Sequence, residues 1–163
     1  EIDLWGKDNI EYLEDTTKKI SIKDFLDKTH SGFKSTLHHL PDFDFTDADY
    51  WVRFRVQKQT NHSVTWVLQN DYSMIHEFNV FLVNETTKEV VKKTIRDSYP
   101  TYQREINVHQ CAIPLDIAPY QNYTVYVQLL STDAKKIQLK LLETHHFYQT
   151  YFDELWFWAL SFA

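Results

Sequence analysis

The stretch Asp49–Gln57 reads Asp-Tyr-Trp-Val-Arg-Phe-Arg-Val-Gln, and its alternation decides the fold class. Every second residue from Tyr50 onward is apolar, whereas the residues between them carry an indole, two guanidinium groups and an amide. Successive side chains of a β-strand point to opposite faces, so the pattern predicts a strand with one face in a hydrophobic core. The other face either recognises a partner, because Trp and Arg are enriched at interfaces, or meets solvent as an ordinary sheet surface does.

Segments of the same kind flank this stretch and are separated by polar turns. We expect further strands at residues 5–13, 64–69, 75–83, 89–95, 105–113, 123–130 and 137–142. About eight short strands with this spacing are typical of an all-β sandwich. Ser21, followed three residues later by Asp24, predicts the start of one short helix over 21–28. The expected core consists of Val52, Phe54, Val56, Val80, Leu82, Val125, Val127 and Leu139.

The overall composition excludes several classes of function. A chain of 163 residues fits one domain, and its net charge of -6 with no basic block argues against nucleic acid as a partner. Only two glycines occur, so no Gly-rich loop is present to hold a phosphate. Cys111 is the only cysteine, which excludes an intrachain disulfide. No catalytic motif is found, and we therefore predict no enzymatic activity, no catalytic residues and no cofactor.

Eight histidines raise the question of a metal site. His38-His39 and His145-His146 are adjacent pairs, and neighbours in a strand face apart, so such pairs rarely hold one ion. His109 and Cys111 would share a strand face but give only two of the three or four ligands that known sites use. The acidic residues of 42–49 could bind calcium, but a solvated acidic loop is favoured because the segment lacks glycine. We therefore predict no metal.

The chain changes character at Thr144. The segment 145–163 contains no Gly or Pro, which favours a helix, and its last charged residue is Glu154. The apolar residues 155–163 would rise about 13 Å as a helix, less than half of the ~30 Å of a bilayer core. They therefore form either the start of a membrane span or a helix docked on the domain, and the abrupt loss of charge favours the span. We divide the chain into a sandwich at 1–143 and a juxtamembrane helix at 144–163.

Several motifs, in this order, resemble one known family. They are Tyr12-Leu13-Glu14-Asp15, the capped helix from Ser21, Tyr50-Trp51-Val52-Arg53-Phe54, Tyr99-Pro100 to Arg104 with His109, Ile113-Pro114-Leu115-Asp116-Ile117-Ala118-Pro119, and Tyr123 to Ser131. Together they resemble the type 2 extracellular domain of bacterial seven-transmembrane receptors with diverse intracellular signalling modules. The likeness covers roughly residues 10–142. Gln128 stands where the family usually has Arg, and most glycines of the family's turns are missing.

The resemblance implies a jelly-roll sandwich like that of carbohydrate-binding modules, on the periplasmic or extracellular side of the bacterial inner membrane. It also implies a sensor domain of a membrane signalling receptor, connected to the membrane through its C-terminal segment. The expected ligand is a carbohydrate or a small molecule that bears a carboxylate. The alternatives are a stand-alone carbohydrate-binding or adhesive module, and a protein-binding or dimerisation domain, for which a homodimer is the simplest form.

The expected ligand site lies on the outer face of the central strand. Trp51, Arg53 and Arg55 occupy this face, and Tyr126 and Gln128 alternate against apolar neighbours in the same way. If the two strands share a sheet, these side chains form a platform of stacking rings and forked donors that suits sugars and carboxylates. By the family likeness, Arg104 closes one end of it. The alternative is that the helix at Ser21 covers Trp51 and that Arg53 pairs with an acidic side chain.

Overall fold

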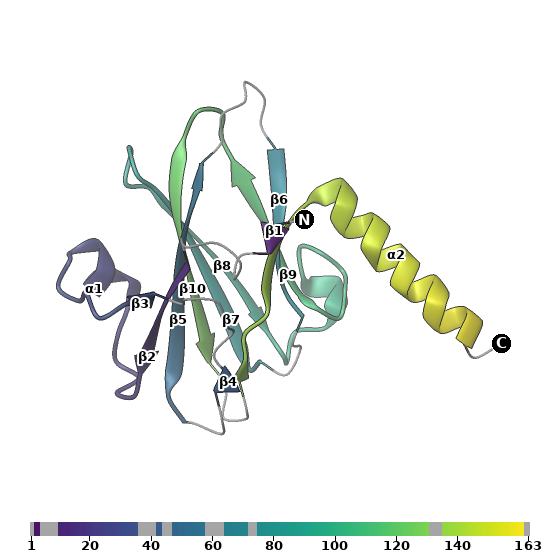
Figure 1. Cartoon of the computed structure of the whole chain (residues 1–163), viewed down its shortest axis with the longest axis horizontal. Coiled ribbons are helices and arrows are strands. Elements are labelled where there is room, and N and C mark those ends of the chain that lie inside the picture. The colour runs from purple at the N-terminus through teal and green to yellow at the C-terminus, as the bar shows by residue number, and fades with distance from the viewer. Residues whose placement is uncertain are drawn as a thin grey trace.

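The computed structural model describes residues 2–3, 10–35, 42–43, 47–57, 64–71, 75–130 and 135–161 of the chain. Two antiparallel sheets pack face to face and enclose the core between them (Figure 1). Helix α1 (Ile22–Leu26) lies outside one sheet and helix α2 (Thr144–Ser161) lies outside the other. The predicted all-β sandwich is therefore confirmed.

The larger sheet has, in the described part of the chain, six strands in the order β3, β2, β5, β10, β7, β8. The strands are β2 (Ile10–Asp15), β3 (Lys34–Ser35), β5 (Asp49–Gln57), β7 (Glu77–Asn84), β8 (Val90–Arg96) and β10 (Asn122–Leu130). The stretch that decides the fold class forms β5 with the expected bounds, at the middle of this sheet. Its neighbours are β2 and β10.

The smaller sheet has the described strands β1 (Ile2–Asp3), β12 (Leu139–Glu143), β6 (Val64–Asn70) and β9 (Cys111–Ile117), in that order. Strands β4 (Asp42–Phe43) and β11 (Lys135–Lys136) form a separate pair. The strand predicted at 105–113 begins only at Cys111 and continues beyond the predicted end, through Pro114, to Ile117. Proline has no N–H to donate, and β9 tolerates it because this strand lies at the edge of its sheet.

Helix α1 begins as the sequence predicts and ends earlier. The backbone N–H and the hydroxyl of Ser21 both donate to the Asp24 carboxylate, each at 2.8 Å, and these bonds hold the pKa of that carboxyl below its usual value. The helix ends at Leu26, because Lys28 adopts a left-handed backbone conformation with φ 55°. One short turn of 3-10 helix, η1 (Thr101–Gln103), follows β8.

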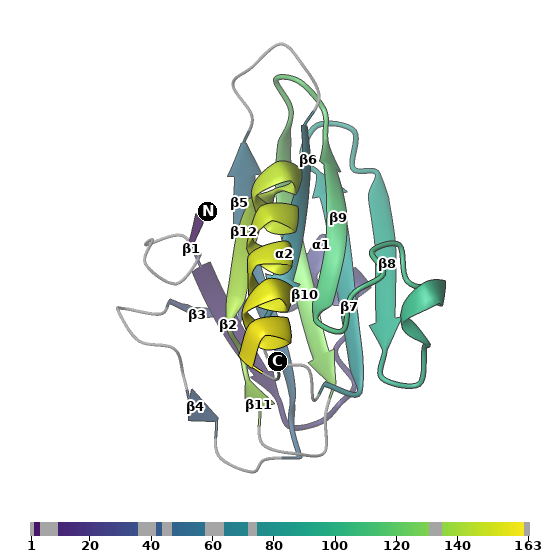
Figure 2. The same cartoon turned by 90° about the vertical axis from the view of Figure 1, so that its right-hand side faces the viewer.

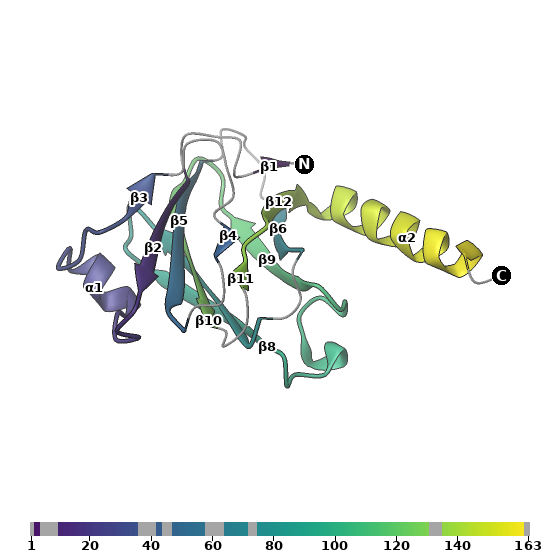
Figure 3. The same ribbon diagram turned by 60° about the horizontal axis from the view of Figure 1, so that its bottom comes forward.

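Helix α2 follows β12 without a connecting loop and extends away from the sandwich (Figures 1 and 3). Its first half is anchored, because Phe147 is buried and packs in a cluster with Val67 and Leu142 of the smaller sheet. Its second half is not covered by the described residues, and its large apolar side chains are exposed: Phe152, Leu155, Trp156, Phe157 and Leu160. Within the described ranges, no helix is long and apolar enough to cross a membrane.

The core prediction is confirmed for all but one of its residues. The inward faces of both sheets form a single cluster, in which Val52, Val125 and Leu139 are fully buried. Val56 is the exception, since it is only partly buried and packs against the rim of this cluster. The alternation of β5 therefore assigns its inner face correctly. Its outer face is the candidate for binding a ligand.

Candidate functional site

Strands β5 and β10 are neighbours, which was the condition for a shared outer face. Their register places Arg53 opposite Tyr126 and Trp51 opposite Gln128. The next pair along, Arg55 and Thr124, also lies on this face. The sequence-predicted residues of β5 and β10 are therefore brought together on one surface of the larger sheet.

The middle of this outer face is not open to solvent. Trp51 is 1% exposed and Tyr126 is 8% exposed, because α1 and its flanking residues cover them. The Phe25 ring stacks on Tyr126 at 5.4 Å between centroids and meets Trp51 edge-on at 4.9 Å. The expectation that Trp51 and Tyr126 form an exposed stacking platform is wrong. The alternative is found, in which the helix at Ser21 covers Trp51.

Trp51 carries an unusual feature for a buried indole. Its Nε1–H is shielded from solvent and has no hydrogen-bond partner among the described residues. Buried indoles usually find an acceptor, and an unpaired donor destabilises the folded state. The ring is held by packing alone, between Phe25 on one side and Phe81 of β7, which stacks on it at 5.7 Å.

At one end of the covered region, the outer face opens into a groove of about 380 Å³. Its lining residues are Glu11, Ser35, Arg53, Phe54, Arg55, Thr124 and Tyr126. Arg53 donates from Nε to the Glu11 carboxylate at 2.7 Å, and its guanidinium lies 4.2 Å from the centre of the Phe33 ring. Arg53 is therefore fixed by an acidic partner from β2 and by an aromatic ring from the segment after α1, as the alternative predicted.

Arg55 is the accessible cation of this groove. Its side chain is 80% exposed, and its only ion pair among the described residues is with Glu85 at 3.2 Å. Glu85 also accepts a hydrogen bond from the Thr124 hydroxyl at 2.8 Å. An ion pair this exposed contributes little to stability, so the Arg55 guanidinium can exchange Glu85 for another carboxylate at small cost.

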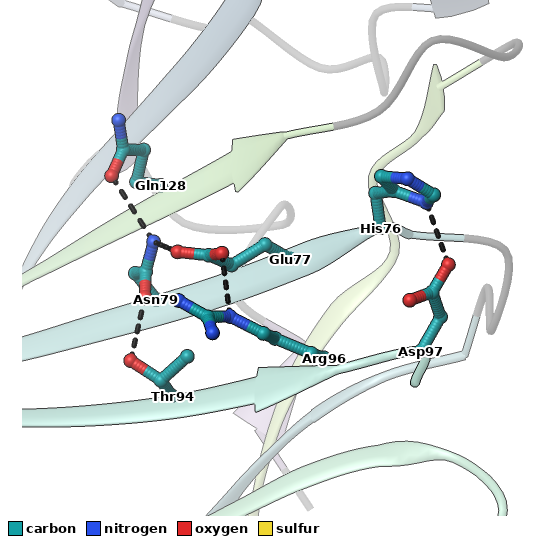
Figure 4. Close-up of polar contacts among 7 residues, drawn as sticks. All are labelled: His76, Glu77, Asn79, Thr94, Arg96, Asp97 and Gln128. Atoms are coloured by element: carbon teal, nitrogen blue, oxygen red, sulfur yellow. Dashed lines mark hydrogen bonds and ion pairs between the residues drawn. The ribbon is translucent and has the colours of Figure 1, made fainter. Parts of the chain in front are cut away.

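Beyond the covered region, Gln128 belongs to a polar network that runs across β10, β7 and β8 (Figure 4). Asn79 is at its centre and is buried; its amide donates to Glu77 at 2.8 Å and to Gln128 at 3.3 Å. The Thr94 hydroxyl donates to the Asn79 oxygen at 2.6 Å, and Arg96 Nε donates to Glu77 at 2.8 Å. Gln128 therefore satisfies a buried amide and does not line the groove.

The charged groups of this network compensate one another. Burial alone would raise the pKa of Glu77, but the hydrogen bonds from Asn79 and Arg96 outweigh it and lower that pKa. The same contact raises the pKa of Arg96. At the edge of the network, His76 Nδ1 lies 2.6 Å from the Asp97 carboxylate, and both side chains are accessible (Figure 4).

Arg104 lies in a different part of the molecule. It follows η1, which lies beside β9 on the opposite side of the sandwich from α1 (Figures 1 and 3). The residues that line the groove come from strands of the larger sheet. Its Nη1 donates to the backbone oxygens of Val108, His109 and Gln110 at 3.1–3.4 Å, and its Nη2 donates to that of Tyr99 at 3.3 Å. The expectation that Arg104 closes the groove is not met, because its guanidinium organises the β8–β9 loop. These bonds also occupy carbonyls that a strand at 105–110 would have needed.

The described ranges contain no group of three or more His, Cys, Asp or Glu residues placed to hold a metal ion. His109 is exposed in the β8–β9 loop, whereas Cys111 is buried at the start of β9, so the two do not share a strand face as expected. Burial raises the pKa of the Cys111 thiol, although the Arg104 guanidinium acts in the opposite direction. His38, His39 and Asp44 of the other candidate metal ligands lie outside the described residues.

Comparison with known proteins assigns the chain to a family. Residues 7–143 match the model of the family described as 7TMR-DISM extracellular 2. The chain belongs to this family. The predicted family is therefore confirmed, and a search of curated proteins found no match.

The 7TMR-DISM extracellular 2 family is an extracellular or periplasmic domain of membrane receptors, which confirms the predicted location. The matched range contains all described strands of both sheets except β1 and ends one residue before α2 begins. The chain is thus an extracellular sensor domain of a receptor. The boundary placed at residue 143 and the ligand site itself stay predictions.

The sequence did not identify the acidic partners of the two arginines in this 7TMR-DISM groove. Glu11 and Glu85 hold Arg53 and Arg55, and neither was considered. Alternation in β2 carries a signal for Glu11, because it stands between the apolar Ile10 and Tyr12. Nothing local identifies Glu85, which follows β7 and reaches Arg55 only because β7, β10 and β5 are consecutive in the sheet.

Proposed function

We propose that this domain is a non-enzymatic ligand sensor and that its ligand, a sugar acid, binds in the groove beside Arg53 and Arg55. The proposal combines the two ligand classes expected from the sequence, a carbohydrate and a small carboxylate-bearing molecule. Membership of a receptor family supports the sensor role. The exposed Arg55 guanidinium, held by one solvent-accessible ion pair, is the observation that carries the choice of ligand.

The lining of the groove favours polar recognition over stacking. Trp51 is buried under α1 and Tyr126 is almost fully buried, so neither ring presents a broad surface to a sugar. The Ser35 and Thr124 hydroxyls and the Glu11 carboxylate can instead bind ligand hydroxyls, while Arg55 binds the ligand carboxylate in bidentate geometry. A volume of about 380 Å³ is within the range of small-molecule sites and accommodates a monosaccharide.

The receptor role also requires a route from the sandwich to the membrane, and we assign it to α2. The helix continues directly from β12, and its second half exposes Leu155, Trp156 and Leu160. These apolar side chains suit the membrane interface or the start of a span. In this proposal, residues 1–143 form a jelly-roll sensor like a carbohydrate-binding module, and residues 144–163 connect it to the membrane.

The test compares galacturonate with galactose, which differ in the carboxylate, by calorimetric or NMR titration of the chain. We expect galacturonate to bind more tightly, and Arg55→Gln to weaken galacturonate about tenfold while changing galactose little. Arg96→Gln is the matched control, since Arg96 is also an exposed arginine in an ion pair on this face but lies outside the groove. Equal affinity of the wild type and Arg55→Gln for galacturonate would exclude this groove, and a failure of galacturonate to bind would exclude the ligand class.

The exposed apolar side chains of α2 also favour a second function, pairing with another copy of the chain. Phe152, Trp156 and Phe157 are each more than half exposed, and apolar groups gathered on one helix seek a partner. The exposure of these side chains argues against the alternative in which this segment docks on its own domain. Sedimentation of the chain with and without detergent separates the two roles. A dimer that persists in detergent and is lost in Trp156→Ser supports pairing, whereas a monomer that binds detergent micelles supports the membrane.

A further inference from the structure

A second cleft lies at the junction between α2 and the smaller sheet. Its volume is about 180 Å³, and its lining residues are Gln69, Asp71, Gln110, Lys140, Leu142, Thr150 and Glu154. Figure 2 shows α2 crossing in front of β6 and β12, the strands that supply Gln69, Lys140 and Leu142. The cleft thus has one wall on the sheet and the other wall on the helix.

The groups on the sheet wall are already paired. Gln69 Nε2 donates to the Asp71 carboxylate at 2.7 Å, and Lys140 Nζ lies 2.8 Å from the other Asp71 oxygen. The negative charge of Asp71 is therefore compensated within the cleft. A ligand gains nothing by replacing these contacts. The groups that are available to bind a ligand are therefore the other polar side chains of the cleft.

Two acceptors remain for a ligand: Gln110 Oε1, which is shielded from solvent, and the Glu154 carboxylate, which is exposed. Gln110 Oε1 is shielded from solvent and has no hydrogen-bond partner among the described residues. Glu154 has no cationic partner there, and its one hydrogen bond is a long contact of 3.5 Å from Gln110 Nε2. A shielded acceptor without a donor destabilises the folded state. A molecule that donates a hydrogen bond to Gln110 Oε1 removes this penalty.

The size and charge of the cleft narrow the class of ligand. A volume of about 180 Å³ lies below the roughly 300–1,000 Å³ of ordinary ligand pockets, so the cleft suits only a small molecule. Gln110 Oε1 accepts hydrogen bonds, and the exposed Glu154 carboxylate is anionic and has no cationic partner among the described residues. The matching ligand carries an ammonium for Glu154 and a hydroxyl or N–H for Gln110.

We propose that this cleft is a second ligand site, which takes a small amino alcohol and whose occupation ties α2 to the smaller sheet. The ligand contacts Glu154 on the helix and Gln110 on the loop that leads into β9, so it bridges two parts of the fold that meet near the middle of α2. It stabilises the arrangement in which both walls are in place, because binding energy is gained only there. This site does not depend on the groove at Arg53 and Arg55 and takes the opposite charge.

The first test uses serinol, an ammonium with two hydroxyls on a three-carbon chain, and glycerol, its neutral counterpart. Two-dimensional NMR titration of the chain reports binding and its location. We expect serinol to shift the side-chain amides of Gln69 and Gln110, and to bind at least about threefold more tightly than glycerol. Glu154→Gln removes this preference, whereas Asp153→Asn, which makes the same change of charge one residue earlier on the exposed helix, retains it.

Three outcomes would overturn the site: equal affinity for serinol and glycerol, equal loss of affinity in Asp153→Asn and Glu154→Gln, or shifts confined to Arg53 and Arg55. The second test addresses the coupling to α2. Saturating serinol is expected to slow amide hydrogen exchange in the middle of α2 severalfold in the wild type and not in Glu154→Gln. Unchanged exchange of the α2 amides in the saturated wild type would overturn the claim that the ligand ties the helix to the sheet.

Discussion

Phe25 holds α1 over the outer face of the larger sheet, and its removal tests whether α1 is a separable cover. The Phe25 ring is the buried contact of a helix of five residues. It touches Trp51 and Tyr126 at 4.9 and 5.4 Å between ring centroids and Phe33 at 4.9 Å. Truncation of this one side chain in Phe25→Ala therefore removes the principal link between α1 and the sheet.

The expected loss follows from these contacts. Burial of a Phe side chain contributes about 1.5–3 kcal/mol, and each well-placed aromatic pair adds about 0.5–1.5 kcal/mol. Ile20, Ile22 and Phe33 still pack against the same cluster, so some contact remains. We expect the free energy of opening α1 to fall by about 3 kcal/mol, which corresponds to about a hundredfold increase in the population of the open form.

The indole proton of Trp51 reports this opening directly. Because its Nε1–H has no hydrogen-bond partner in the described structure, its protection from exchange depends on the cover alone. In Phe25→Ala we expect the Trp51 indole proton to exchange about a hundredfold faster, while the backbone amide of Val127 in the core changes little. Phe157→Ala on the exposed half of α2 is the control and leaves both rates unchanged. If the Trp51 and Val127 rates rise together, α1 is part of the global core and the reasoning fails.

The other predictions concern the turns, a buried carboxylate and the base of α2. Lys88 has φ 63°, a conformation that favours glycine, so Lys88→Gly should stabilise the fold by about 0.5–1 kcal/mol in chemical denaturation, and a loss of stability would contradict this. Burial alone would raise the pKa of Asp15, but hydrogen bonds from Thr17 and the Ile20 N–H lower it. The ionised Asp15 carboxylate therefore stabilises the fold fully above its unfolded pKa near 3.8, and this stabilisation is lost as the pH falls through its lower pKa in the folded state. Asp15→Asn should cost roughly 1–3 kcal/mol at pH 7 and less at pH 3; a constant cost would argue against this linkage. Truncation after Thr144 removes the buried Phe147 and should lower stability by about 3–5 kcal/mol, whereas truncation after residue 151 should not, as a comparison of melting temperatures can show.

Alternation along the chain predicted the part of the fold that depends on a strand having two faces. It gave β5 its bounds and its buried face, because a shift by one residue would expose Val52 and Phe54 to solvent. It could not predict what covers the outer face. Trp51 is buried by Phe25, which lies in a different segment, and that contact depends on how the chain before β5 folds back over the sheet.

The same limit explains the errors at the candidate site. Arg53 and Arg55 were placed correctly on one face, but their partners come from β2 and from the turn after β7, and strand order cannot be read from alternation. Arg104 was assigned through a family motif, and its role in the fold became clear only from the carbonyls that it contacts. The predicted start of β9 was too early for a related reason. The backbone oxygens of residues 108–110 accept hydrogen bonds from Arg104, so they do not pair in the sheet.

The direct junction between β12 and α2 makes the helix a lever. The Thr144 hydroxyl donates to the backbone oxygen of Thr65 on β6 at 2.7 Å, and Phe147 is buried one turn later, so the pivot lies at the base of the helix. The 18 residues of α2 rise about 27 Å, and a rotation of about 10° at the pivot would move the far end by about 5 Å. A displacement of one ångström beside Thr65 is therefore magnified severalfold at Ser161. Small changes of sheet geometry, too slight to alter the packing of the core, become movements as large as a turn of helix.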